Sequence, residues 1–314
     1  MAQFSPREFI NKKTSYLRSE IGGETSIVAL SGGVDSSVTA VLGFKAAGRS
    51  LKAVFLEDGF MRMGEAERIS RVFRNMGISV DVHDVQKEFL AALKGIRDAE
   101  EKRKAFRETF YKTFSRIAKE EGAKIVLQGT IAADIVETAG GVKTQHNVLE
   151  QIGINPLEKY GFKIVEPLKE LYKNQVRMVA RELGLPDEIV NRRPFPGPGL
   201  AIRILGEVTE EKLSVIRKAT SIVDDELADV ECFQAFPVLL EGRATGVGGE
   251  SSRKYGYMIA LRIVESEDAI TAKYVRLDWS RLERIRDIII RDIPEVSRVL
   301  YDVTDKPPAT IEFE

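Results

Sequence analysis

The sequence predicts an α/β fold: an open, mostly parallel sheet with helices on both faces, followed by a smaller α+β domain. Between residues 26 and 185, short β-rich runs alternate with longer helical patterns, which is typical of a parallel sheet with crossover helices. The runs SIVALS and KIVLQ are almost continuously apolar, as expected for strands whose two faces are both covered by helices. With 314 residues, the chain is long enough for two domains of ordinary size.

The first domain is expected to contain a strand in each of its short apolar runs. The strands are predicted at 26–31, 51–57, 78–85 and 123–130, with a further one at 162–168. Between them, apolar residues recur at the spacings of a helix face. These stripes are Val38, Val41 and Leu42; Ile69, Val72, Phe73 and Met76; Phe106, Phe110, Phe114 and Ile117; and Val176, Val179 and Leu183.

The alternation ends at RRPFPGPGL, residues 192–200, which holds three prolines and two glycines. Such a segment cannot lie inside a helix or a central strand. We therefore place the domain boundary near Leu185, which gives domains at 1–185 and 186–314. The second domain reads strand, helix, several strands, helix, strand, with helices at 209–228 and near 278–292 that would pack on an antiparallel sheet. Leu282, Ile285 and Ile289 form the apolar face of the later helix.

Composition excludes several classes of protein. The formal net charge of −1 gives no reason to expect a nucleic-acid partner. Cys232 is the only cysteine, which rules out an intramolecular disulfide or a CxxC pair, and we expect it to be a buried thiol. The N-terminal residues lack an apolar stretch long enough for a signal peptide or membrane anchor. We therefore expect a cytoplasmic protein with no membrane association.

The stretch VALSGGVDSS, residues 28–37, predicts an anion-binding turn between a strand and a helix. Gly32 and Gly33 let the backbone approach a ligand closely. The unpaired amides and the dipole of the following helix favour an anion, and Ser31, Ser36 and Ser37 add hydroxyl donors. The alternative is an ordinary tight turn capped by Asp35 or a serine. A Walker loop is excluded because the GxxxxGK[ST] pattern is missing.

Three further stretches carry candidate residues. In LQGTIAADIVET, residues 127–138, Asp134 and Glu137 lie three apart, which places them on one face of a helix. The alternative for them is a solvated helix start. Lys169 in VEPLKEL follows a strand and could neutralise the charge of a bound phosphate group; the alternative is an ordinary surface charge. In AEEKRKAFRETF, residues 99–110, the alternating charges are typical of a solvated helix face.

Taken together, these motifs resemble known families. SGGVDSS resembles the pyrophosphate loop of the N-type ATP pyrophosphatases, whose fold is of the adenine nucleotide α-hydrolase type. The ordered set SGGVDSS, QGTxxxDxxE, EKRK, HNV, EPLKEL, PFPGPGLAIR and KPPATIEFE resembles the synthetase part of the GMP synthetase family, of the archaeal split form. The last two motifs are the most specific, because other pyrophosphatases with this loop lack them.

The resemblance implies a reaction. The O2 oxygen of xanthosine monophosphate (XMP) attacks the α-phosphate of ATP, and ammonia then displaces AMP to give GMP, with pyrophosphate as the other product. This is the final step of de novo GMP synthesis. It implies Mg²⁺ as cofactor and ATP as co-substrate, and it requires no covalent enzyme intermediate. Catalysis would rest on positioning and charge stabilisation.

The resemblance also implies roles for individual residues. Asp35 and Lys169 would be catalytic. ATP and pyrophosphate would be bound by Ser31, Gly32, Gly33, Val34, Asp35, Ser36, Ser37, Gly129, Thr130 and Lys169. The metal ligands would be Asp35, with Asp134 or Glu137. XMP would be bound by Arg103 on a lid near residues 95–160, and by Gln234, Glu250, Arg253, Lys306, Ile311 and Glu312.

Two partners are implied as well. A homodimer through the second domain is a family property, and the C-terminal tail completes its XMP pocket. The loop begins at Ser31, which leaves no room for a preceding glutaminase domain, and Cys232 in VECFQAF is not on a glycine-rich elbow. We therefore expect a separate glutaminase subunit to deliver ammonia, with free ammonium as a second source.

The chain departs from the family pattern twice. TQHNVLEQIGIN, residues 144–155, has Gln145 before His146 where the family commonly has a second histidine, and the glycines after HNV are missing. GGESSRKY, which contains Glu250 and Arg253, is about one residue longer than usual. The alternatives are an NAD synthetase-like amidase, a tRNA-thiolating relative, which the single cysteine disfavours, and a catalytically silent nucleotide sensor.

Overall fold

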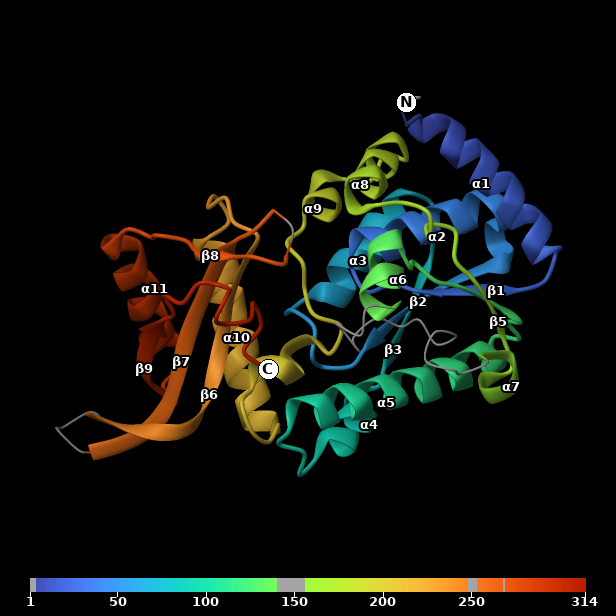
Figure 1. The fold of residues 1–314 in the computed structure, drawn as a ribbon. Helices are drawn as coiled ribbons and strands as arrows, with labels where there is room; N and C mark the ends of the chain where they lie inside the picture. Colours follow the sequence, from blue (N-terminus) through green and yellow to red (C-terminus); the bar gives the residue numbers. More distant parts are fainter. Residues whose placement is uncertain (1–3, 140–155, 248–252, 268) are drawn as a thin grey trace. The chain divides into compact units, whose positions relative to one another are not determined.

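The computed structural model describes residues 4–139, 156–247, 253–267 and 269–314. The chain forms two compact units (Figure 1). Unit 1 contains the residues up to Glu57, Gly64–Val85 and Arg107–Arg192. Unit 2 contains Asp58–Met63, Gln86–Phe106 and Arg193–Glu314. Two segments from the first half of the chain therefore belong to unit 2.

Unit 1 is built on a five-stranded sheet in the order β3-β2-β1-β4-β5, in which all neighbours are parallel. The strands are β1 (Ser26–Ala29), β2 (Leu51–Glu57), β3 (Val80–Asp84), β4 (Ile125–Leu127) and β5 (Lys163–Val165). This confirms the predicted parallel sheet. Ile27, Val28, Val54 and Phe55 are almost fully buried on the central strands, which explains their continuous apolar character.

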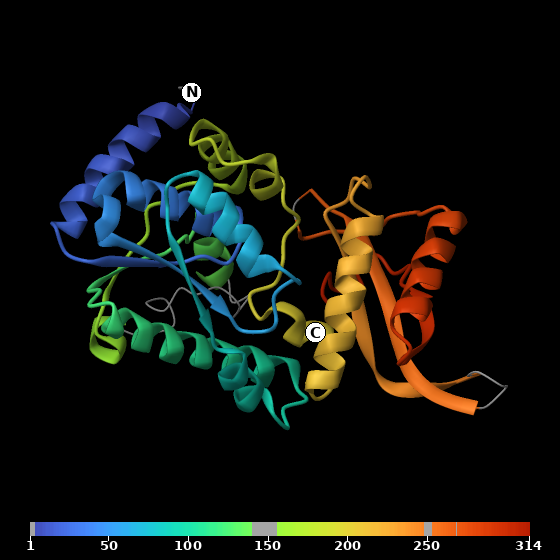
Figure 2. The same cartoon turned by 180° about the vertical axis from the view of Figure 1, so that it is seen from behind.

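Helices cover both faces of this sheet. On one face α2 (Val34–Ala47) packs against α1 (Pro6–Ile21) and α8 (Lys173–Glu182). The part of α5 (Ala99–Glu120) that belongs to unit 1 lies on the opposite face (Figures 1 and 2). The unit also contains η1 (Gly48–Ser50), α3 (Glu65–Asn75), α6 (Ala132–Ala139), α7 (Pro156–Tyr160) and α9 (Asp187–Val190).

The strand order reverses direction at β1. The chain passes from β1 to β2 and β3 on one side, and then returns to place β4 on the other side of β1. Ser26 of β1 is accordingly paired with both Leu51 and Ile125. In open α/β sheets, ligands bind beyond the carboxyl ends of the strands at such a reversal. The loops that follow β1 and β4 therefore flank the expected binding position.

Unit 2 contains a four-stranded sheet. The long strands β6 (Gln234–Val247) and β7 (Arg253–Glu265) are antiparallel, and β8 (Lys273–Tyr274) is antiparallel to β7. The last strand, β9 (Val296–Tyr301), runs parallel to β7. The sheet is therefore mixed, whereas the sequence predicted an antiparallel one. The connection that includes α11 (Trp279–Asp292) is long enough for a parallel crossover.

The helices of unit 2 confirm the two predicted ones. α10 (Glu210–Glu226) begins after Thr209, whose side chain accepts a hydrogen bond from the Lys212 amide at 3.2 Å, as in a standard N-cap. It packs on β6, and α11 packs on β9 through Ile285 and Ile289. The unit also includes α4 (Gln86–Leu93), the start of α5 and η3 (Gly199–Arg203). No helix in the described ranges is both long and apolar enough to cross a membrane.

Candidate nucleotide-binding site

The loop after β1 begins α2 in the way that the glycines predict. Gly32 has φ 76°, a left-handed conformation that favours glycine. Gly33 is the N-cap residue of α2, with φ −79° and ψ 157°, and its position is not capped by a side chain. The amides at this helix end therefore lack side-chain caps, which is the arrangement that binds phosphate in other proteins.

The loop serines hold the turn together from inside. The Ser36 and Ser37 hydroxyls donate to the Gly33 carbonyl at 3.1 and 2.8 Å. The Ser31 and Ser36 hydroxyl oxygens lie 3.1 Å apart, and the Ser31 amide donates to Ser36 Oγ at 3.2 Å. The Gly33 amide reaches Ser31 Oγ only at 3.4 Å, which is long for a hydrogen bond. That amide is therefore weakly satisfied within the loop.

Two residues that the sequence analysis missed support the loop from behind. Arg192 Nη1 donates to the Gly32 carbonyl at 2.9 Å and to Glu65 Oε1 at 2.5 Å, and Nη2 pairs with Glu65 Oε2. The Glu65 side chain is 2% exposed and the Arg192 side chain 12%. The only sequence signal was an acid at the start of a helix and an arginine before the proline-rich segment, which is not specific.

Asp35, in the first turn of α2, forms an ion pair with Lys173 at the start of α8. Lys173 Nζ lies 2.5 Å from Asp35 Oδ2. The other oxygen, Oδ1, is buried and has no hydrogen-bond partner in the described structure. Burial raises the pKa of Asp35, the Lys173 ammonium lowers it, and the charge of Asp134 raises it again. Asp35 thus presents a partly desolvated carboxylate oxygen that lacks a donor or cation.

The loop after β4 approaches α2 closely at Gly129. A Cβ atom at this position would lie 2.9 Å from the Asp35 carbonyl carbon and 3.0 Å from the Ser36 amide nitrogen. Because these are backbone atoms, only glycine fits without moving the start of α2. The next residue, Thr130, is buried and donates to Glu166 Oε1 at 2.6 Å. Gly129 thus permits the close approach of α2, and Thr130 is held by Glu166.

The candidate metal residues near this loop differ in what the structure describes. Asp134 Oδ2 accepts from the Ile131 amide at 2.9 Å, so it caps the start of α6. Glu137 belongs to α6, but its side chain lies outside the described part. Among the described residues, no group of three or more His, Cys, Asp and Glu side chains could hold a metal ion. Lys169 is exposed in the turn between β5 and α8.

Unit 2 holds a second group of predicted residues around Arg203. The Arg203 guanidinium donates to both carboxylate oxygens of Glu312, at 3.1 and 2.8 Å, and lies over the rings of Phe236 and Phe195. Beside the ring of Phe236 on β6, Gln234 is buried; its amide donates to the Pro194 carbonyl at 3.2 Å, and its Oε1 is buried without a described partner. The two hydrogen bonds from Arg203 therefore fix the orientation of the Glu312 carboxylate. The sequence analysis did not identify Arg203 as a site residue.

The C-terminal tail is organised around a buried arginine. Arg262 on β7 is fully buried, pairs with Asp302 at 3.0 Å and donates to the carbonyls of Thr304, Thr310 and Ile311. The Ile311 side chain packs against a cluster that contains Phe236. The predicted site residue Lys306 donates from Nζ to the Ala269 carbonyl at 2.8 Å. The tail that carries Lys306, Ile311 and Glu312 is thus fastened to the sheet.

The EKRK stretch is solvated only in part: Glu101 and Lys104 are exposed, whereas the two residues between them are buried. Lys102 is fully buried; its ammonium donates to the Ile204 carbonyl at 2.6 Å and pairs with Glu314 at 2.5 Å. Arg103 is buried and donates to Glu100 Oε1 at 2.7 Å. The solvated-face interpretation is therefore wrong for Lys102 and Arg103, because Lys102 is buried against Ile204 and Glu314, and Arg103 is buried and paired with Glu100.

The remaining predicted XMP residues are not brought together with this group. Arg253 is paired with Val247 at one end of the β6–β7 ladder, whereas Gln234 is paired with Val264 at the other. At about 3.3 Å per residue, eleven steps along β7 separate the two ends by about 35 Å. Glu250, and Gln145 and His146 of the predicted lid, lie outside the described residues.

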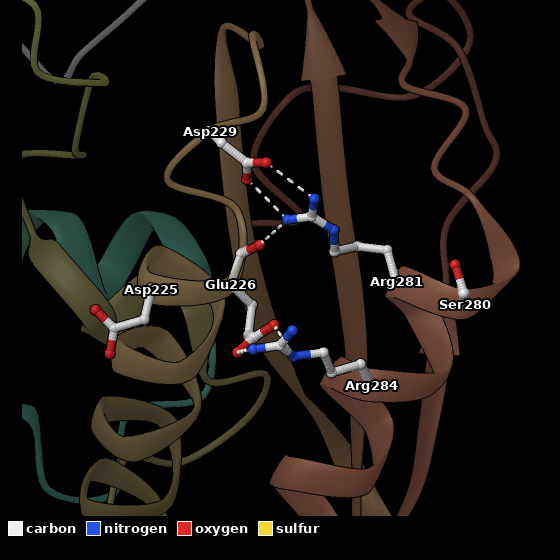
Figure 3. A pocket seen from close by; sticks show the side chains of 6 residues that line it. All are labelled: Asp225, Glu226, Asp229, Ser280, Arg281 and Arg284. Carbon is white, nitrogen blue, oxygen red and sulfur yellow. Dashed lines mark hydrogen bonds and ion pairs between the residues drawn. The ribbon is translucent and has the colours of Figure 1, made fainter.

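A polar groove between α10 and α11 does not contain any of the predicted site residues. Figure 3 shows its lining, which is Asp225, Glu226, Asp229, Ser280, Arg281 and Arg284. Arg281 pairs with both carboxylate oxygens of Asp229 at 2.7 and 2.9 Å, and Arg284 pairs with Glu226 at 2.8 Å. The groove is thus closed by ion pairs that fasten one helix to the other.

Cys232, the lone cysteine, is only half-buried, and burial raises the pKa of its thiol.

The parallel sheet with an uncapped glycine-serine loop at its reversal point defines unit 1 as an α/β domain of the nucleotide-binding class. In agreement, residues 6–186 match the family described as the PP-loop domain, and residues 221–313 match the GMP synthase C terminal domain. The chain belongs to the family of glutamine-hydrolyzing GMP synthases, as the separate subunit that carries these two domains. The resemblance drawn from the motifs is therefore confirmed.

Three relatives, each named as one subunit of GMP synthase [glutamine-hydrolyzing], illustrate the match. The protein from Methanopyrus kandleri is 49% identical over 99% of this chain and 100% of the relative. The one from Methanocaldococcus jannaschii is 48% identical over the same shares, and the one from Archaeoglobus fulgidus is 51% identical over 98% of this chain and 99% of its own. A solved structure of NMN synthetase from Francisella tularensis is 20% identical over 72% of this chain and 87% of its own, with a TM-score of 0.49.

Proposed function

We propose that this chain catalyses the ATP-dependent amination of XMP to GMP through an adenylyl-XMP intermediate, with release of AMP and pyrophosphate. One observation carries the proposal. The uncapped SGGVDSS loop stands at the reversal point of the sheet, in a chain that matches GMP synthase relatives over nearly its full length. The loop supplies the anion site, and the second unit carries the tail characteristic of this family.

In this proposal the loop binds the β- and γ-phosphates of ATP and keeps them as pyrophosphate. The contacts would come from the amides and hydroxyls of Ser31–Ser37, at the positive end of α2. Lys173 is a further candidate cation for these phosphates, since it contacts Asp35 at 2.5 Å. Lys169 is retained as a phosphate contact in the proposal, from its exposed turn.

Mg²⁺ fits the donor set at the loop. Asp35 Oδ1 is a buried carboxylate oxygen without a described partner, and the charge of Asp134 acts on the same group. Mg²⁺ is commonly held by one or two carboxylates together with substrate phosphates. Asp35 would hold the ion, with Asp134 or Glu137 as further ligands, and the ion would supply charge neutralisation on the departing pyrophosphate.

The XMP part of the proposal rests on unit 2. Gln234 offers a buried amide oxygen without a described partner, and Arg203 holds Glu312 at 2.8 Å. A carboxylate has about four lone-pair sites, so Glu312 can accept a base N–H while it stays paired. Ile311 supplies an apolar contact. The cations Arg103, Lys306 and Arg253 are proposed for the nucleotide, with Glu250.

Ammonia is proposed to come from a separate glutaminase subunit. The relatives are each named as one subunit of a glutamine-hydrolyzing enzyme, which supports a second chain as the source of ammonia. A homodimer through unit 2 and a cytoplasmic location complete the proposal. In the absence of the partner, free ammonium would serve as the nitrogen source at high concentration.

The direct test is an assay of purified protein with XMP, ATP, Mg²⁺ and ammonium, in which GMP, AMP and pyrophosphate are measured. Equal amounts of the three products are expected. No GMP at high ammonium would disprove the synthetase function, and ATP cleavage with a carboxylate substrate in place of XMP would favour the NAD synthetase-like alternative. GMP formation from glutamine without a second protein would disprove the need for a glutaminase subunit.

A further inference from the structure

We propose that Arg192 and Glu65 act as a positioning pair that sets the orientation of the Gly32–Gly33 peptide group in the phosphate loop. This inference rests on the proposed function of that loop, but it assigns roles to two residues outside the SGGVDSS motif. Neither residue touches the bound phosphate in this proposal. Their effect is exerted through the backbone of Gly32.

The contacts define one orientation of the peptide. Arg192 Nη1 donates to the Gly32 carbonyl at 2.9 Å. Because a trans peptide group places its C=O and N–H on opposite sides, a carbonyl held by Arg192 directs the Gly33 N–H away from Arg192. That N–H lies on the side of the Ser31 hydroxyl, 3.4 Å from Oγ. The long contact leaves the amide free to donate to a phosphate oxygen instead.

Glu65 fixes the arginine in turn. Both guanidinium Nη atoms pair with the two carboxylate oxygens of Glu65, a bidentate geometry that restricts rotation of the guanidinium plane. Glu65 is the first residue of α3, at the positive end of that helix, and its side chain is 2% exposed. A buried carboxylate requires such a partner, so Arg192 has little freedom to leave the Gly32 carbonyl.

The same pair explains why Gly32 cannot carry a side chain. A Cβ atom on Gly32 would overlap Arg192 Nη1 and Glu65 Oε1, and the residue has φ 76°. The pair therefore occupies the space immediately behind the loop. A change of the Gly32–Gly33 peptide would need the carbonyl to leave Arg192 and the buried ion pair to rearrange. The pair thus holds the Gly32–Gly33 peptide in a single orientation.

The inference is tested by pyrophosphate binding to the full chain, measured by calorimetry with Mg²⁺, together with KM for ATP and kcat. The variants are Arg192→Lys, Arg192→Gln and Glu65→Gln. Arg192→Gln is expected to weaken pyrophosphate binding by tenfold or more. Arg192→Lys keeps a charge but loses the fork and should recover only part of the affinity, and Glu65→Gln should lie between wild type and Arg192→Gln. The loss should appear in KM for ATP as well as in kcat, while KM for XMP stays unchanged.

Two matched controls separate positioning from general stability. Arg193→Lys changes the adjacent arginine, whose contacts are the carbonyls of Leu227 and Val230 in unit 2. Arg68→Gln removes a second, weaker partner of Glu65. Arg68 Nη2 lies 3.5 Å from Glu65 Oε1, and no contact joins Arg68 to Gly32 in the described structure. Both should bind pyrophosphate like wild type. Thermal unfolding confirms that each variant is folded at the assay temperature.

The outcomes are distinct. If wild type binds pyrophosphate and folded Arg192→Gln binds it equally well, the positioning role is wrong while the proposed function stands. Equal losses in Arg192→Gln and Arg193→Lys would also overturn it, since the effect would then not depend on the contact with Gly32. If wild type itself binds no pyrophosphate, the proposed function of the loop fails. Should Arg192→Gln not fold, the comparison of Arg192→Lys with Arg193→Lys decides the question.

Discussion

Lys173 Nζ lies 2.5 Å from Asp35 Oδ2, although the two residues are 138 positions apart in the chain. The contact joins the start of α8 to the first turn of α2, so a lysine ammonium lies beside the phosphate loop. The Lys173 side chain is 44% exposed, which leaves it able to turn toward a phosphate group.

We predict that Lys173→Met lowers kcat/KM for ATP more strongly than Lys169→Met. The reason is that Lys173 already contacts the loop carboxylate, whereas Lys169 lies in an exposed turn. A loss of about 10²-fold is expected for Lys173→Met, as for the removal of one charge-stabilising donor. Steady-state kinetics at saturating XMP and ammonium measure it. A larger loss in Lys169→Met would instead make Lys169 the principal phosphate lysine.

Asp35→Asn should remove activity and also change the dependence of stability on pH. Burial raises the pKa of Asp35 above 3.8. The folded protein therefore binds more protons than the unfolded chain between pH 3.8 and that raised pKa, and wild-type stability falls as pH rises through this window. The asparagine variant lacks this titration.

The melting temperature of Asp35→Asn relative to wild type should accordingly rise from acid to neutral pH, while kcat falls by about 10²-fold or more. Thermal unfolding without nucleotide, over a series of pH values, measures the first effect. Lys173→Met is the control, since it removes the same ion pair and leaves the buried carboxylate. A pH-independent difference for Asp35→Asn would show that Asp35 is not desolvated in the folded protein.

Glu314→Gln should destabilise the protein through Lys102. The Lys102 side chain is fully buried and its ammonium pairs with Glu314 at 2.5 Å. Removing one partner of a buried pair typically costs about 3 kcal/mol in the free energy of unfolding. Replacing both partners, in Lys102→Met with Glu314→Gln, should recover much of the loss. Chemical denaturation of the single and double variants measures the coupling.

Glu120→Gln on the exposed Arg116–Glu120 pair is the matched control, with an expected change in the free energy of unfolding of about 0.5 kcal/mol or less.

The Lys102–Glu314 pair should also make stability depend on pH. Burial lowers the pKa of Lys102, while Glu314 raises it. Without Glu314 the ammonium should release its proton at lower pH, so the loss of stability in Glu314→Gln should shrink as pH rises toward 10.5. A loss that does not depend on pH would argue against a charged Lys102.

The sequence predicted the elements well where burial is periodic. Phe106, Phe114 and Ile117 are buried on α5 as their spacing indicated, and the continuous apolar runs became the central strands β1 and β4. The tight turn between β1 and α2 was also predicted, because its glycines and serines act within a few residues of one another. These features depend on neighbours in the chain, which a single sequence records directly.

The partners of the site residues could not be predicted in the same way. Glu65 and Arg192 are 127 positions apart, and Lys102 and Glu314 are 212 apart. A charged residue on a helix has the same local pattern whether it is solvated or paired at a distance. For this reason EKRK was compatible with a solvated face, although Lys102 is buried. Only the fold decides which acid meets which base.

The hairpin of β6 and β7 gives a prediction about assembly. Arg253 and Gln234 lie at opposite ends of this ladder, so one chain cannot place both on the same XMP molecule. If both bind XMP as proposed, Arg253 must reach the site of a second copy. The homodimer would then be required for activity, because each site would contain residues from both chains.

Complementation between inactive variants tests this. Arg253→Ala and Asp35→Asn should each lose most activity as pure proteins. When equal amounts are mixed and allowed to exchange protomers, half of the dimers carry one of each chain. Each site would take Asp35 from one chain and Arg253 from the other. In a mixed dimer, one site therefore contains both substituted residues, and the other site has intact Arg253 and Asp35. The mixture should recover about a quarter of wild-type activity. As a control, Gln234→Ala mixed with Asp35→Asn should recover none if Arg253 is the residue from the second chain. Recovery with Gln234→Ala instead of Arg253→Ala would assign Gln234 to the second chain, and recovery with neither would refute the shared site.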